Sequence, residues 1–175
     1  TLPSSLSTIG TSAFEGCLGL KKLIIPDSVK TVGENAFASC ASLETVSIGK
    51  GLDTISKGMF EGCTALNGVI LPDNIKTIDD YAFSCCDSLE TIAIYPHVST
   101  VGNYAFYDCD SLSKIALPET VTVIGEGVFA ECEKLQSVSI AETSLTTLSI
   151  YTASNSIVFP YIPTYLNANS TDLSA

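Results

Sequence analysis

Seven cysteines are the residues of this 175-residue sequence most able to do chemistry. Six of them recur every 23 residues, at Cys17, Cys40, Cys63, Cys86, Cys109 and Cys132. Such thiols could form disulfides, bind a metal or pack as small apolar groups. A disulfide needs Cβ atoms about 3.5 to 4.5 Å apart, whereas side chains stacked in parallel register lie about 4.8 Å apart. A zinc site needs four ligands that converge on one point, so the straight row favours buried free thiols.

Cys85 is the one cysteine outside this row. It occupies the position that other repeats fill with Gly16, Ser39, Gly62, Asp108 and Glu131. We therefore expect the Cys85 thiol to be exposed and open to alkylation, without a bond to its neighbour Cys86.

Nucleophilic catalysis by a thiol needs a base beside it, and His97 is the only histidine. We expect His97 in a solvated loop and Cys86 on the opposite side of its repeat, so the two side chains should not meet. The sequence has no phosphate-cradling glycine motif and no Ser, His, Asp arrangement. It therefore predicts no catalytic residue, no cofactor, no metal site and no enzyme activity.

Carboxylates gather in the later repeats, and a cluster of acids can bind calcium. No loop glycine and bidentate glutamate complete a calcium motif here. The sequence predicts solvated acids on the convex side of a solenoid, at Asp87, Asp108, Asp110, Glu131 and Glu133.

The elements that hold these residues follow from apolar columns with the same 23-residue period. Three residues before each regular cysteine stands a phenylalanine, from Phe14 to Phe129, and three residues after it a leucine, from Leu20 to Leu135. Each leucine opens a short alternating apolar run typical of a strand. One such repeat cannot bury its apolar side alone, but stacked repeats make a continuous core. The pattern predicts a leucine-rich-repeat solenoid of about six coils, with a parallel β-sheet on the concave face and turns or short helices on the convex face.

Two regions are expected along the chain. Residues 1–142 form the solenoid, which begins in the middle of a repeat and so resembles a fragment of a longer array. Residues 143–175 begin with an irregular last repeat around Leu145 and Leu148, without phenylalanine or cysteine. The aromatic, proline-punctuated end then predicts a cap or a linker.

Whole repeats such as "PDSVKTVGENAFASCASLETVSI" and "LPETVTVIGEGVFAECEKLQSVSI" resemble the BspA-like subclass of leucine-rich repeats over residues 1 to about 142. Met59 and Val128 replace the usual alanine, and Ser56 and Asp79 the usual glycine. The resemblance implies a bacterial secreted or cell-surface protein, or a similar protist protein, that functions in adhesion. Free thiols would suit the anaerobic habitat that it also implies.

Composition limits the partners. The net charge is −11, from 19 acids and 8 bases, so binding to nucleic acid or to an anionic membrane is disfavoured. No apolar run is long enough to span a bilayer, and no signal peptide opens the chain. We expect a monomer that binds a host or neighbouring-cell protein, with a structural spacer or an accessory domain of a larger surface protein as alternatives.

The partner is expected on the strand face. Its outward positions vary between repeats and are nearly free of acids, which favours binding over a monotonous spacer. The predicted binding residues are Lys22, Ile24, Thr45, Ser47, Ile70, Thr91, Ala93, Tyr95, Lys114 and Ala116.

Overall fold

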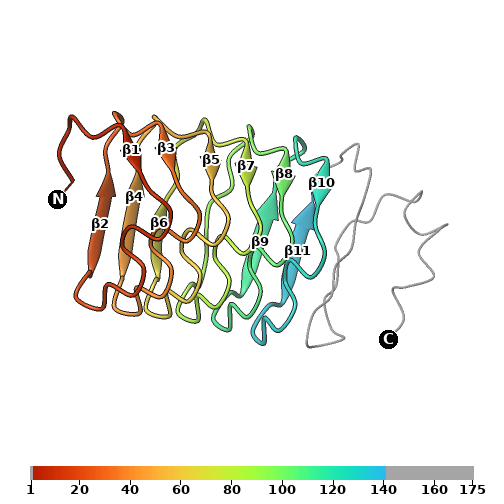
Figure 1. Ribbon diagram of the computed structural model, residues 1–175. Coiled ribbons are helices and arrows are strands. Elements are labelled where there is room, and N and C mark those ends of the chain that lie inside the picture. Colours follow the sequence, from red (N-terminus) through yellow and green to blue (C-terminus); the bar gives the residue numbers. More distant parts are fainter. Residues whose placement is uncertain (1, 141–175) are drawn as a thin grey trace.

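The computed structural model describes residues 2–140, which wind into six stacked coils (Figure 1). We number the coils from 1 to 6, beginning at residues 6, 29, 52, 75, 98 and 121. The array is a parallel-strand solenoid of the leucine-rich-repeat type, which confirms the predicted fold class. Residues 143–175, predicted to be a separate region, lie outside the described residues.

One row of strands comes from the predicted apolar runs. The long strands are β2 (Lys22–Ile25), β4 (Thr45–Ile48), β6 (Gly68–Ile70), β9 (Lys114–Leu117) and β11 (Ser137–Ile140). In β2 and β9 exposed and buried residues alternate strictly, because successive side chains of a strand point to opposite faces. Pairing is parallel and in register with the repeat, as between Leu23 and Val46. We call the outer surface of this row the long-strand face.

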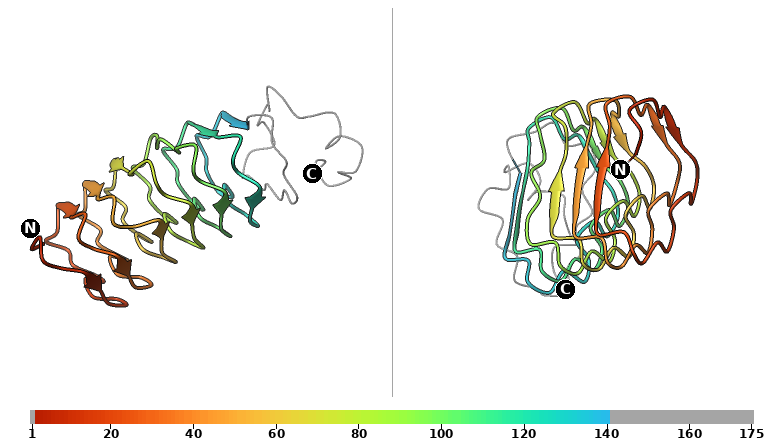
Figure 2. Two further views of the ribbon diagram at one scale, coloured as in Figure 1. Left: turned by 90° about the horizontal axis from the view of Figure 1, so that it is seen from above. Right: turned by 90° about the vertical axis from the view of Figure 1, so that its left-hand side faces the viewer.

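A second row of strands was not predicted as such. Two-residue strands run along the other side of the array (Figure 2): β1 (Thr8–Ile9), β3 (Thr31–Val32), β5 (Thr54–Ile55), β7 (Thr77–Ile78), β8 (Thr100–Val101) and β10 (Val123–Ile124). Their second residue is buried and continues the core, while their first residue faces outward.

The segments between the short and long strands are turns, and residues 2–140 contain no helix. Backbone N–H groups of each turn donate to carbonyls of the next coil, as from Phe37 to Met59 at 3.1 Å. These bonds join every pair of neighbouring coils. Two residues per turn adopt a left-handed conformation, as Asn35 and Ser39 do with φ of 55° and 56°. Of the turns or short helices predicted for the convex face, residues 2–140 therefore show turns.

The core is built from the phenylalanine and cysteine columns. Phe37, Phe60, Phe83, Phe106 and Phe129 are fully buried. Neighbouring rings from Phe14 onward stack, with centroids 5.2 to 5.9 Å apart. Each regular cysteine from Cys40 onward donates its thiol to the phenylalanine carbonyl of the preceding coil. Apolar contact and a hydrogen bond therefore repeat together at each junction.

Both rows of strands are interrupted, at different places. The long-strand row pairs β2, β4 and β6, and separately β9 and β11, whereas the short-strand row breaks between β3 and β5. The expectation of a strand in coil 4, around Thr91 and Ala93, is therefore wrong. At the position where Lys50 donates its N–H to Asp27, coil 4 has Pro96, which has no N–H to donate. In coil 3 the hydroxyl of Ser56 replaces a backbone donor and bonds the carbonyl of Val32 at 2.5 Å.

Candidate protein-binding face

The long strands position the predicted binding residues by alternation. Their inward residues fill the core, so the side chains between them must face solvent. Lys22, Ile24, Ile70, Thr91, Ala93, Tyr95, Lys114 and Ala116 are exposed, while Thr45 and Ser47 are half-buried between neighbouring strands. The predicted residues thus share one face of the array, although Thr91, Ala93 and Tyr95 come from the unpaired segment of coil 4.

Part of this face is hollowed. A shallow groove of about 630 Å³ crosses the carboxyl ends of β2, β4 and β6 and reaches Tyr95. Ile24 and Ile70 are 60% and 64% exposed, and the smaller Ser47 lies between them in the intervening coil. The Ile24 and Ile70 side chains are longer than the Ser47 side chain between them, so a depression with apolar sides lies over Ser47.

The rim of the groove carries three charged side chains, Asp27, Lys50 and Asp73. The Lys50 ammonium lies 3.2 Å from the Asp73 carboxylate, and both side chains are exposed. This contact lowers the pKa of Asp73, first through the hydrogen bond from Lys50 and then through its charge. The Asp27 carboxylate accepts the backbone N–H of Lys50 at 2.7 Å. Lys50 and Asp73 therefore balance each other, while Asp27 keeps its negative charge.

Four of the ten predicted residues line the groove, namely Ile24, Ser47, Ile70 and Tyr95. The other six lie outside its lining, along the rest of the face. Sequence reasoning did not include the strand-end residues that complete the groove, among them Pro26, Leu71, Pro72 and Asp73. Proline at a strand end gives no sign of a concavity in the sequence.

Cys86 and His97, the thiol and the imidazole considered for catalysis, bond different backbone carbonyls. Cys86 is buried and donates to the Phe60 carbonyl at 3.3 Å, and burial raises its pKa well above the ordinary value. Burial likewise raises the pKa of Cys63 to about 12. His97 is exposed, and its Nδ1 donates to the Asp73 carbonyl at 2.7 Å. Cys85 is half-buried, so the expectation of full exposure is only partly met.

A parallel-strand solenoid with an exposed strand face belongs to the class of leucine-rich-repeat proteins, whose extended surfaces generally bind other proteins. The model of the BspA type leucine rich repeat region matches residues 1–110 and 62–159 in six copies. The chain belongs to this family, as the resemblance of its repeats predicted.

Solved structures agree with this assignment. A leucine-rich repeat protein from Eubacterium ventriosum is 27% identical with a TM-score of 0.68, over 85% of this chain and 37% of that chain. One from Bacteroides ovatus is 26% identical with a TM-score of 0.62, over 91% of this chain and 55% of that chain. This chain thus spans well under two thirds of either protein.

A third structure shows a likeness of fold only. A leucine rich cell surface protein from Faecalibacterium prausnitzii is 23% identical with a TM-score of 0.58, over 98% of this chain and 56% of that chain. No curated protein matches this sequence. Within residues 2–140 there is no helix with the length and apolar character needed to cross a bilayer.

Proposed function

We propose that this chain is a non-catalytic binding module of a bacterial secreted or cell-surface protein, and that it adheres to a host or neighbouring-cell protein through its long-strand face. One observation carries the proposal. Of the five large hydrophobic side chains exposed among the described residues, three line the same groove: Ile24, Ile70 and Tyr95. Large exposed apolar groups that converge in one hollow are typical of a docking site, whereas scattered ones are ordinary.

The shape and charge of the face support a protein partner. The backbone under the groove is held by parallel pairing of three strands, so little ordering is needed on binding. Ile24, Ile70 and the Tyr95 ring would supply buried contact area, and the paired rim charges would exclude water around it. A passive spacer has no use for this convergence of apolar groups. The surface location rests on membership of the BspA-type family and on the name of the F. prausnitzii protein.

The test is a double substitution, Ile24→Glu with Ile70→Glu, measured as binding to immobilised matrix proteins and to epithelial cells. Both sites are exposed, so the fold should survive. We expect binding to fall at least about tenfold, the effect of losing one central apolar contact in an interface. The matched control is Leu18→Glu with Val123→Glu, which adds the same charge at exposed apolar residues outside the groove, 65% and 39% exposed.

Two outcomes contradict the proposal. Loss of binding in the control pair to the same extent would make the effect one of added charge. Full binding by the Ile24→Glu, Ile70→Glu variant would move the site away from the long-strand face.

A further inference from the structure

A cluster of three tyrosines lies on the turns of coils 4 and 5, away from the groove. Tyr81 and Tyr104 stack with ring centroids 5.3 Å apart, and Tyr107 meets Tyr104 edge to face at 5.9 Å. All three are half-buried and none belongs to the core. We call these three residues the tyrosine patch.

The fold does not require tyrosine at these positions. Tyr81 and Tyr104 have φ of 57° and 55°, in the left-handed region that a bulky residue rarely adopts. At the same position, other coils have Ser12, Asn35, Gly58 and Gly127, which are all smaller, and glycine and asparagine tolerate this conformation best. Two tyrosines therefore occupy strained positions where the repeat supplies better residues. The only packing gained there is among the three rings themselves, outside the core, and strained residues of this kind cluster at functional sites.

The neighbouring glycines leave room beside the stack. Tyr104 lies over Gly127, where an added Cβ would come within 2.3 Å of the ring. Tyr81 covers the other side of Tyr104. In the preceding coil Gly58 occupies the position equivalent to Tyr81, and the Asn35 side chain reaches over Gly58. The Glu61 carboxylate reaches this place, because an oxygen lies 3.1 Å from where a Gly58 Cβ would stand.

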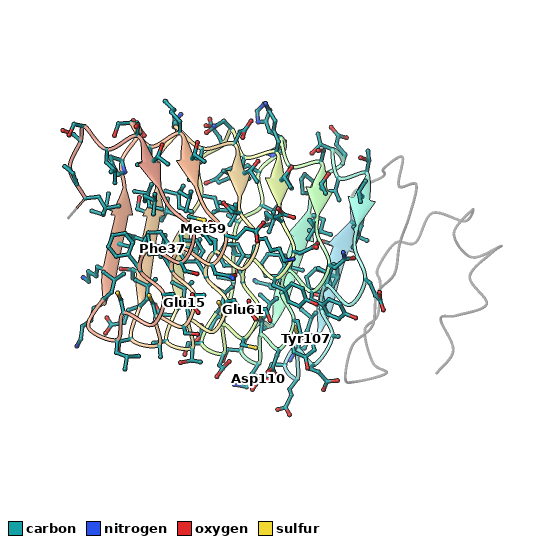
Figure 3. The ribbon with its side chains drawn as sticks, viewed as in Figure 1. Glu15, Phe37, Met59, Glu61, Tyr107 and Asp110 are labelled. Atoms are coloured by element: carbon teal, nitrogen blue, oxygen red, sulfur yellow. The ribbon has the colours of Figure 1, made fainter. Side chains whose placement is uncertain are left out.

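Carboxylates surround the patch. The charge of Glu126 is the first cause that raises the pKa of Tyr104. Asp108 and Glu131 act on Tyr107 in the same direction, after burial. The turns of coils 3 to 6 carry two bases, Lys57 and Lys134, against nine acids: Glu61, Asp79, Asp80, Asp87, Asp108, Asp110, Glu126, Glu131 and Glu133. Figure 3 shows Glu61, Tyr107 and Asp110 along this part of the array.

We propose that the tyrosine patch is a second binding surface, which takes lysine or arginine side chains of a basic polypeptide segment. A cation over the face of a tyrosine is attracted by the negative potential of the ring. Glu61 and Glu126 flank the stack, and their carboxylates would supply the negative charge to pair with the bound cation. The acidic surround draws a basic segment toward the patch, and the rings hold its side chains by contact. This surface is separate from the groove, whose lining contains none of the three tyrosines.

The test uses capped hexa-arginine as the probe and isothermal titration as the measurement. The variant Tyr81→Asn with Tyr104→Gly replaces both rings by residues that the repeat itself uses at this position. We expect affinity to fall about five- to thirty-fold, which is the combined effect of two exposed cation–π contacts. The melting temperature should stay the same or rise, because the left-handed strain is relieved. Binding and folding thus change in opposite directions, which separates a binding role from a structural one.

A second pair of variants separates the patch from the general negative charge. Glu61→Gln with Glu126→Gln should weaken hexa-arginine binding, whereas Glu90→Gln with Glu119→Gln, exposed sites outside the turns, should leave it nearly unchanged. The two pairs alter net charge equally. Equal losses in both pairs, or unchanged affinity in the tyrosine variant, would overturn the proposal and leave only attraction to an acidic protein.

Discussion

The Cys63 thiol donates a hydrogen bond to the Phe37 carbonyl oxygen, 3.2 Å away in the preceding coil. The same bond recurs at five junctions, with sulfur-to-oxygen distances of 3.0 to 3.3 Å. A phenylalanine carbonyl can also accept from its own coil, as the Phe60 carbonyl does from the Cys63 N–H at 3.2 Å. Cysteine fits this column because it is small and apolar and still carries one donor.

Replacing Cys63 by alanine should remove both the sulfur and this donor. Cys63 is fully buried, so a small cavity and a weakened carbonyl contact should together cost about 1 to 3 kcal/mol of unfolding free energy. Urea unfolding measures this. Cys17→Ala is the control, because Cys17 is partly exposed and no described coil precedes it. An equal loss at both sites would show that the inter-coil bond adds nothing.

Phe60→Ala should be among the most damaging single changes. Phe60 is fully buried between Phe37 and Phe83, with ring centroids 5.8 and 5.5 Å away. Emptying such a site costs about 3 to 5 kcal/mol. Phe14→Ala, at a half-buried ring in the first coil, should cost clearly less in the same thermal unfolding assay. Normal stability of Phe60→Ala would contradict the assigned repeat register.

The left-handed turn positions offer a change that should stabilise the fold. Ser39 is exposed with φ of 56°, and Gly62 occupies the same position one coil later with φ of 69°. Ser39→Gly should gain up to about 1 kcal/mol, because relief of a left-handed residue outweighs the added freedom of the unfolded chain. Gly62→Ala should lose a similar amount, since its Cβ meets nothing closer than 3.4 Å and the cost lies in the backbone. Calorimetry that gave both changes the same sign would refute this account.

Thiol labelling should divide the seven cysteines into two groups. Cys17 and Cys85 are half-buried and the other five are buried. We expect alkylation of the native chain without reductant to modify those two, and alkylation after denaturation to modify all seven. Peptide mass mapping identifies the sites. A thiol that remained unmodified in denaturant would reveal a disulfide.

Stability should depend on pH through Asp87. Its pKa is raised above the ordinary 3.8, first by burial and then by the charges of Asp108 and Asp110. The folded chain therefore holds this proton more tightly than the unfolded chain, and the stability that it adds at low pH is lost as pH rises above 3.8. Asp87→Asn should raise the urea midpoint at pH 7 and leave it unchanged well below pH 3.8.

Asp53→Asn supplies the opposite case for the same titration. The pKa of Asp53 is lowered, first by the hydrogen bond from Lys76, at 3.2 Å. Its contribution is present above the ordinary pKa and disappears as pH falls, so the substitution should slightly lower stability at pH 7. A rise in both variants would show that reducing the net negative charge is the dominant effect.

Much of the fold was readable from residues such as Phe60, Cys63 and Leu66, because buried side chains repeat strictly along the chain. The short strands were missed because two residues such as Thr54 and Ile55 are too few to show alternation. Gly58 and Gly62 suggest left-handed turn positions. Tyr81 and Cys85 occupy the same positions one coil later, and their residue types do not suggest a positive φ. Apolar periodicity does not reveal the break in coil 4, because Ile92 and Ile94 continue the alternating run there.

The candidate face was only partly predictable. Alternation places Ile24 and Ile70 outside, since their neighbours must fill the core. The groove between them depends on the height of Ser47 relative to both isoleucines and on the path of the chain after Pro72, which are three-dimensional properties. The tyrosine patch was not predicted from the sequence. Tyr81 and Tyr104 lie 23 residues apart, Tyr107 follows three residues later, and no recognised motif links the three.

The staggered interruptions of the two strand rows have a mechanical consequence. Where the short-strand row breaks, between β3 and β5, the long strands β4 and β6 are paired, and where the long-strand row breaks, β7 and β8 are paired. The turns are joined by backbone hydrogen bonds at every junction. At every junction between neighbouring coils, therefore, at least one of the two strand rows is continuous. A force that pulls the coils apart along the array must rupture backbone hydrogen bonds at whichever level it acts.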